Sequence, residues 1–136
     1  MKATVIRRER FAAAHRLFNP DWDDEKNREV FGKCSWKNYH GHNYLLEVRV
    51  TGNIDPMTGF VMNLSELKQI IRRVLEDFDH KNLNLDVPEF KDLQPSTENL
   101  ARILWNRLRN LIPEKFDLEI YLEETENNAV IFNGEL

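Results

Sequence analysis

The residues best suited to chemistry lie between Cys34 and His42, where the only cysteine of the chain precedes a His-Gly-His triplet. Residues two apart on a β-strand point to the same face, so His40 and His42 are predicted to stand side by side. Gly41 between them leaves room for a group to approach closely. Two neutral imidazoles on one rigid strand face supply half of a zinc site.

A third histidine changes the interpretation of this pair. His15 ends a strand predicted over residues 3–15 and shares the parity of Phe11 and Ala13. If this strand lies beside the next one, three imidazoles converge and leave a fourth position for water or substrate, as in catalytic zinc sites. Cys34 as a fourth ligand would instead close the site, and the spacing alone leaves both arrangements open.

Cys34 itself has two interpretations. A lone cysteine often behaves as a small buried hydrophobe. Here it lies in a polar segment between Lys33 and Lys37, and neighbouring cations favour the reactive thiolate. The pair Asp79 and His80 is also ambiguous, because this histidine is either a cap at a helix C-terminus or a general acid or base held by a carboxylate.

Glu124 interrupts the apolar face of a strand predicted over residues 117–125. It continues the parity of Leu118, Ile120 and Leu122, so its carboxylate is predicted to reach the core-facing side unless the strand frays first. A buried carboxylate needs paired hydrogen-bond donors, and the edge of a guanidine-like ring would supply two parallel ones.

Hydrophobic periodicity predicts the elements that position these residues. Alternation indicates four strands, and a 3.6-residue period behind Asn63 and behind Ser96 or Thr97 indicates two capped helices. We expect a long polar loop with one helical turn before the cysteine. We also expect a short additional strand after the first hairpin. The strands are residues 3–15, 39–52, 117–125 and 129–133, the helices run to about 79 and to Pro113, the helical turn is near 24–31, and the additional strand is 59–62.

The order of strand, strand, helix, helix, strand, strand predicts an α+β fold in which a four-stranded antiparallel sheet carries both helices on one face. We expect one domain over residues 1–136. A sheet that small with one bare face favours oligomerisation.

Composition excludes several classes of protein. The chain is 41% hydrophobic and 31% charged with a net charge of -4, and it has no basic stripe that would suggest a nucleic-acid partner. No apolar run is long enough to predict a signal peptide or a membrane span. One cysteine forms no internal disulfide, which favours a reducing, cytoplasmic location.

Several motifs in one order resemble the 6-pyruvoyl-tetrahydropterin synthase family nearly end to end. The motifs are Phe31-Gly32-Lys33-Cys34, His40-Gly41-His42-Asn43-Tyr44, Asp55-Pro56-Met57-Thr58-Gly59, Asp79-His80-Lys81-Asn82-Leu83, Thr97-Glu98-Asn99 and Glu124-Thr125. The resemblance implies the T-fold, in which the sheets of a trimer join into a barrel and two trimers form a homohexamer. It also implies that His15, His40 and His42 bind Zn²⁺.

The resemblance further implies a lyase that converts 7,8-dihydroneopterin triphosphate to 6-pyruvoyl-tetrahydropterin with loss of triphosphate, a step of tetrahydrobiopterin synthesis. Cys34 would be the catalytic base, with Asp79 and His80 as proton-relay partners contributed by a neighbouring subunit. Lys33 or Lys37 would meet the triphosphate, a hypothesis that rests on position alone.

The same resemblance makes Glu124 the anchor of the pterin ring, with Ser96 and Thr97 beside it. Three alternatives remain open. The related 6-carboxytetrahydropterin synthase uses the same constellation but a shorter spacing between its cysteine and its histidine pair than the one here. A non-catalytic metal- or pterin-binding module would not need Cys34. A cupin shares the His-x-His strand, but cupins are nearly all β.

Overall fold

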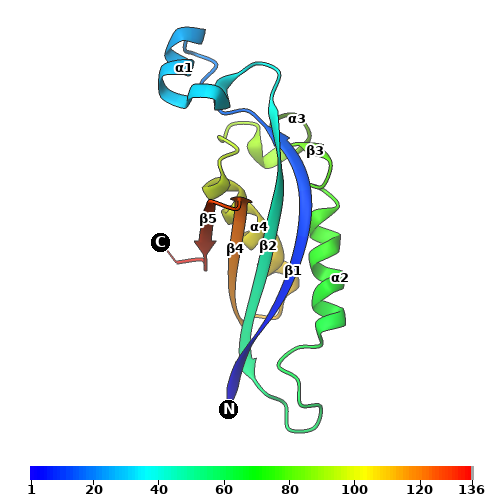
Figure 1. Cartoon of the computed structure of the whole chain (residues 1–136). Helices are drawn as coiled ribbons and strands as arrows, with labels where there is room; N and C mark the ends of the chain where they lie inside the picture. The colour runs from blue at the N-terminus through cyan, green and yellow to red at the C-terminus, as the bar shows by residue number, and fades with distance from the viewer. Residues whose placement is uncertain (136) are drawn as a thin grey trace.

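Two long antiparallel strands lie next to each other in the interior of the sheet. The computed structural model describes residues 1–135, in which β1 (Lys2–His15) pairs with β2 (His40–Asn53) along its whole length (Figure 1). The register sets His15 directly opposite His40. The loop between the strands therefore begins and ends at a histidine.

The sheet has the order β3-β1-β2-β4-β5. The outer strands β4 (Asp117–Thr125) and β5 (Asn128–Phe132) continue it antiparallel, so the predicted four-stranded antiparallel sheet and the α+β class are confirmed. The fifth strand, β3 (Lys81–Asn82), pairs parallel with β1 and was not predicted. Two residues are too few to show an alternating pattern.

Two amphipathic helices cover one face of this sheet (Figure 1). In α2 (Leu64–Leu75), the Asn63 side chain accepts a hydrogen bond from a backbone N–H of the first turn, and Ser96 does the same for α4 (Thr97–Leu111). The helix α2 ends earlier than its apolar stripe suggested, because the chain turns after Leu75 while Phe78 stays buried. No helix in residues 1–135 is long and apolar enough to cross a membrane.

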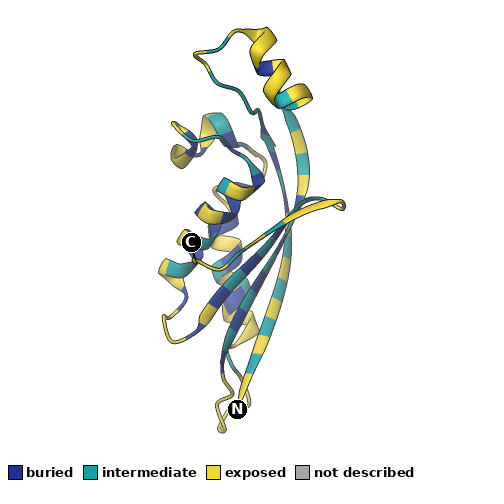
Figure 2. Ribbon diagram, turned by 90° about the vertical axis from the view of Figure 1, so that its left-hand side faces the viewer, coloured by how far each residue is buried: buried dark blue, intermediate teal, exposed yellow. Residues whose placement is uncertain are grey.

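The core fills the space between the helices and the sheet, where Figure 2 shows the buried residues concentrated. Alternate residues of the strands face it, as the period-2 pattern requires. Fully burying one leucine or isoleucine side chain contributes about 1.5–3 kcal/mol to the stability of the fold. The fully buried side chains include Tyr44, Leu46, Leu67, Ile71, Leu100, Leu104, Leu108, Ile120 and Leu122.

The segment between β1 and β2 folds beyond the end of the sheet (Figure 1). It contains α1 (Asp24–Phe31) and the short 3-10 turn η1 (Gly32–Ser35), so the predicted helical turn is confirmed. Asn27 is buried, and its side-chain amide donates to the carbonyl of Asn19 at 3.0 Å and accepts from the N–H of that residue at 2.7 Å. The segment is thus ordered by its own polar side chains.

The expected short strand at residues 59–62 is wrong. The backbone folds back on itself here, with the N–H of Asp55 bonded to the carbonyl of Phe60 at 2.8 Å and that of Gly59 to Asp55 at 2.7 Å. Gly59 has a φ of 76°, which glycine adopts without strain. A closed turn uses the backbone groups that a strand would need.

The connection from β3 to α4 is also more ordered than a loop. It holds α3 (Leu83–Asp86) and the 3-10 turn η2 (Pro88–Phe90), which bury three apolar residues against the core: Leu83, Val87 and Phe90.

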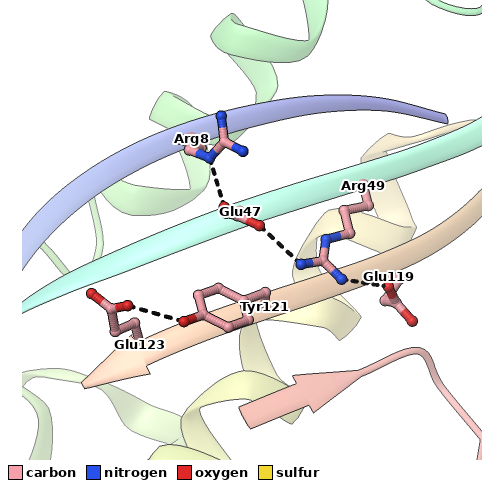
Figure 3. Close-up of polar contacts among 6 residues, drawn as sticks. All are labelled: Arg8, Glu47, Arg49, Glu119, Tyr121 and Glu123. Atoms are coloured by element: carbon pink, nitrogen blue, oxygen red, sulfur yellow. Dashed lines mark hydrogen bonds and ion pairs between the residues drawn. The ribbon is translucent and has the colours of Figure 1, made fainter. Parts of the chain in front are cut away.

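The face of the sheet that carries no helix bears a row of polar contacts (Figure 3). Glu47 on β2 accepts from Arg8 on β1 at 2.6 Å and from Arg49 at 3.0 Å. Arg49 donates to Glu119 on β4 at 3.0 Å. The helix-covered face of the sheet is therefore apolar and the other face is polar, so the predicted alternation along the strands is confirmed.

Candidate metal centre and active site

Three histidines meet at one end of the sheet, on its helix-covered side. His15 and His40 are cross-strand partners, and His42 follows two residues along the same face. Their ring centroids lie 4.5 to 5.0 Å apart, and one nitrogen from each ring lies within 4.8 Å of the others. The predicted convergence of three imidazoles is present in one chain.

The free nitrogens of these rings fit a metal ion. His15 Nε2, His40 Nδ1 and His42 Nε2 are buried, and none has a hydrogen-bond partner among the described residues. A buried polar atom without a partner costs free energy, so three of them side by side call for a shared ligand. Three imidazole nitrogens are a donor set typical of an open zinc site.

The electrostatics of the cluster favour neutral rings. Burial lowers the pKa of His15, His40 and His42, and the neighbouring rings lower each pKa further. The Nδ1–H of His15 donates to the backbone carbonyl of Pro95 at 2.7 Å, which leaves a lone pair on Nε2. Such a bond fixes the tautomer and the orientation of a metal ligand.

Glu124 lies beside this cluster. Its half-buried side chain continues the parity of Leu118, Ile120 and Leu122 and contacts Thr97 and His42, so the predicted core-facing parity is confirmed. Its Oε1 lies 3.7 Å from His42 Nε2, and its Oε2 accepts a hydrogen bond from the Thr97 hydroxyl at 2.5 Å. One carboxylate oxygen is therefore held by Thr97 and the other lies near the unpaired nitrogen of His42.

The neighbouring Ser96 has a different role. Its hydroxyl accepts from the backbone N–H of Asn99 at 3.2 Å and caps α4. Of the two hydroxyls predicted beside Glu124, only that of Thr97 reaches it within residues 1–135.

Cys34 is a half-buried free thiol in η1, and it is not a member of the three-histidine cluster. Burial raises the pKa of this thiol, and the negative charge of Glu124 raises it further. The expected support from Lys33 and Lys37 is not met, because Lys37 forms an ion pair with Asp24 at 3.0 Å and neither lysine contributes to the pKa shift. The surroundings of Cys34 within its own chain therefore raise the pKa of its thiol and do not lower it.

Asp79 and His80 form a dyad at the edge of the sheet. The Asp79 carboxylate lies 2.9 Å from His80 Nδ1 and accepts from the N–H of Ala12 at 2.9 Å, while the N–H of His80 donates to the carbonyl of Ala12 at 2.6 Å. His80 has a left-handed φ of 61°, and its side chain is 83% exposed. It lines an open cavity of about 540 Å³ that also includes Gly41.

This dyad makes no polar contact with the described thiol of its own chain. Within residues 1–135 no hydrogen bond or ion pair joins Asp79 or His80 to Cys34 or to the three histidines. The structure thus brings together the three histidines, Glu124 and Thr97, and leaves His80 exposed beside the backbone of Ala12.

Sequence reasoning missed a group of supporting residues. The Asn84 side chain accepts from the N–H of Arg16 at 2.8 Å and donates to its carbonyl at 2.9 Å, and Gln94 makes the same pair of bonds with Phe18. These partners lie 68 to 76 positions apart in the chain, so no local pattern reveals them. Together with Pro95, they hold the chain at and just beyond His15.

These observations define an α+β domain that carries a three-histidine metal-type site at the end of a twisted antiparallel sheet. The family model of 6-pyruvoyl tetrahydropterin synthase matches residues 4–135. The chain belongs to this family.

Individual relatives agree with this assignment. The 6-pyruvoyl tetrahydrobiopterin synthase of Pongo abelii is 46% identical over 135 residues, which covers 98% of this chain and 93% of that protein. The human protein of the same name is 44% identical over the same shares of each chain. The solved structure of Caenorhabditis elegans 6-pyruvoyl tetrahydropterin synthase has 36% sequence identity and a TM-score of 0.92, covering 99% of this chain and 97% of the other.

Proposed function

We propose that this protein is a zinc-dependent lyase that converts 7,8-dihydroneopterin triphosphate to 6-pyruvoyl-tetrahydropterin with elimination of triphosphate. The observation that carries the proposal is the convergence of three unpaired imidazole nitrogens, one of which, His42 Nε2, lies 3.7 Å from a held carboxylate, in a chain of this family. Each part of that arrangement has a role in the reaction.

His15, His40 and His42 would hold the zinc ion and leave a coordination position open. When bound, zinc supplies a Lewis acid that polarises the oxygens of the substrate side chain and acidifies the protons on the adjacent carbons. Neutral rings are required for this, and the lowered pKa values of the three histidines supply them at neutral pH.

Cys34 is proposed as the base that removes those protons. Its thiol needs a nearby positive charge, because burial and Glu124 raise its pKa in the chain itself. Asp79 and His80 are proposed to relay the proton onward from a neighbouring copy. The exposure of His80, and the absence within residues 1–135 of any hydrogen bond or ion pair from the dyad to Cys34, support a site completed between subunits.

Glu124 is proposed to anchor the pterin. A carboxylate accepts the two parallel N–H groups of a guanidine-like ring edge, and such charge-assisted pairs fix orientation as well as affinity. The Thr97 hydroxyl holds one oxygen in place, so the carboxylate is oriented before the ring binds. The reacting side chain then lies toward the three histidines.

The assembly and the location follow from the same proposal. We propose a homohexamer built as a dimer of trimers, one domain over residues 1–136, and a cytoplasmic enzyme with a small pterin substrate. Light scattering at micromolar concentration measures the mass directly, and a monomer with full activity would reject a site shared between subunits.

The deciding experiment supplies 7,8-dihydroneopterin triphosphate to the zinc-loaded protein and identifies the product by mass. The proposal predicts 6-pyruvoyl-tetrahydropterin and stoichiometric triphosphate. A 6-carboxytetrahydropterin product would replace the pyruvoyl assignment, and tight pterin binding without turnover would identify a binding module.

A further inference from the structure

Arg16 makes an unusual set of contacts directly after the metal-binding His15. Its side-chain Nε donates to the backbone carbonyl of Ser35 at 2.8 Å, and its guanidinium carbon lies 3.8 Å from the centre of the Phe18 ring. A planar guanidinium can direct an N–H along its plane and stack its face on an aromatic ring at the same time. The side chain is therefore fixed in two directions.

The carbonyl that Arg16 binds belongs to the turn that carries Cys34. The N–H of the next residue, Leu17, donates to the carbonyl of Cys34 itself at 2.8 Å. Within the turn, the Ser35 hydroxyl donates to the carbonyl of Gly32 at 2.8 Å. Two consecutive carbonyls of the thiol-bearing turn are thus bound by two consecutive residues that follow a metal ligand.

The backbone on either side of the Arg16 side chain is itself held by hydrogen bonds. Asn84 bonds both backbone groups of Arg16, and Gln94 bonds both backbone groups of Phe18. The same segment contributes the Pro95 carbonyl that orients the ring of His15. The backbone from which Arg16 reaches the turn is consequently held by hydrogen bonds that do not involve the turn.

We propose that Arg16 is a positioning residue for the reaction, which sets the position of the Cys34 turn relative to the three histidines. The proposal rests on the role of Cys34 as the base in the proposed function. In this role Arg16 acts through the turn and not on the substrate or the reacting atoms. Its contribution is to hold the thiol, and a misplacement of about 1 Å in such a group costs on the order of 100-fold in rate.

The test compares Arg16→Lys with Arg10→Lys. Lysine keeps the charge of Arg16 but lacks the planar fork. Arg10 lies on β1, the strand that ends just before Arg16, is exposed, and has no side-chain hydrogen bond or ion pair within residues 1–135, so its replacement controls for loss of an arginine. Arg16→Lys is expected to lower kcat by about 10- to 100-fold with KM changed less than twofold. Arg10→Lys is expected to leave both unchanged.

A second readout does not depend on turnover. Hydrogen exchange at the Leu17 amide reports the bond to the Cys34 carbonyl, and the rate of Cys34 alkylation by iodoacetamide reports the exposure of the thiol. Both rates are expected to rise several-fold in Arg16→Lys, with zinc content unchanged. If Arg16→Lys does not fold, Phe18→Leu removes the stacking surface alone and is judged by the same measurements.

The outcomes separate the two proposals. Unchanged kcat and unchanged Leu17 exchange in an active Arg16→Lys protein would overturn the positioning role and leave the proposed function intact. A raised KM with unchanged kcat would overturn it as well, because it would make Arg16 a binding residue. Wild-type protein that lacks turnover would instead reject the proposed function, on which the role of Arg16 in the reaction depends.

Discussion

The hydrogen bond between Thr97 and Glu124 gives the sharpest quantitative prediction. The hydroxyl lies 2.5 Å from Oε2, Thr97 is only 9% exposed, and the Glu124 side chain is 23% exposed. Thr97→Val replaces the hydroxyl with a methyl group of similar size. The carboxylate then loses its hydrogen bond from Thr97 while nearly all of its packing remains.

The magnitude follows from the chemistry of the bond. Hydrogen bonds to charged groups contribute about 1.5–3 kcal/mol. Because Glu124 is partly exposed, water replaces some of the loss, so Thr97→Val is expected to lower the free energy of unfolding by about 1.5 kcal/mol. A pterin held by the misdirected carboxylate should bind roughly tenfold more weakly.

Urea unfolding measures the stability, and fluorescence titration with 7,8-dihydroneopterin measures the binding without the triphosphate. Thr4→Val is the matched control, because the Thr4 hydroxyl bonds that of Thr51 at 2.6 Å on the exposed surface. The double-mutant cycle with Glu124→Met, which has no oxygen to accept from Thr97, isolates the pair, and a coupling energy near zero would refute the assigned bond. So would a Thr97→Val protein that matches Thr4→Val in both assays.

Three further predictions concern the site. Cys34→Ala should retain zinc and 7,8-dihydroneopterin binding but lose on the order of 100-fold or more in kcat, since the base is gone while the binding groups remain; near-normal turnover would exclude it as the base. His42→Ala should lose bound zinc on metal analysis, whereas His80→Ala should retain it; stoichiometric zinc in the former contradicts the three-histidine site. Metal-free protein should lose stability as pH falls below about 6.5, the ordinary histidine pKa. The lowered pKa values of His15, His40 and His42 mean that the unfolded chain binds protons first, and equal urea midpoints at pH 7.5 and 5.5 would disprove this.

Much of this site could be predicted from the sequence because side chains alternate between the two faces of a β-strand. The alternation over residues 39–52 placed His40 and His42 on one face, and the same rule placed His15 and Glu124 on the core-facing side. The helices were predictable because their caps and apolar stripes are local signals. These features depend on neighbours within a few positions.

The remaining features depend on distant parts of the chain. The amides of Asn84 and Gln94 bond residues 68 to 76 positions away, and β3 is a two-residue strand defined only by its partner. The environment of Cys34 was misjudged for the same reason. Two sequence neighbours suggested a positive surrounding, but one pairs with Asp24 and a distant carboxylate, Glu124, acts on the thiol.

The most direct test of the account is anomalous diffraction at the zinc edge from crystals of the purified, zinc-loaded protein. We predict one full-occupancy peak within about 2.1 Å of His15 Nε2, His40 Nδ1 and His42 Nε2, with a non-protein ligand in the fourth position. The absence of a peak there, or a peak whose fourth ligand is the Cys34 sulfur with and without a bound pterin, would contradict the proposed open catalytic site.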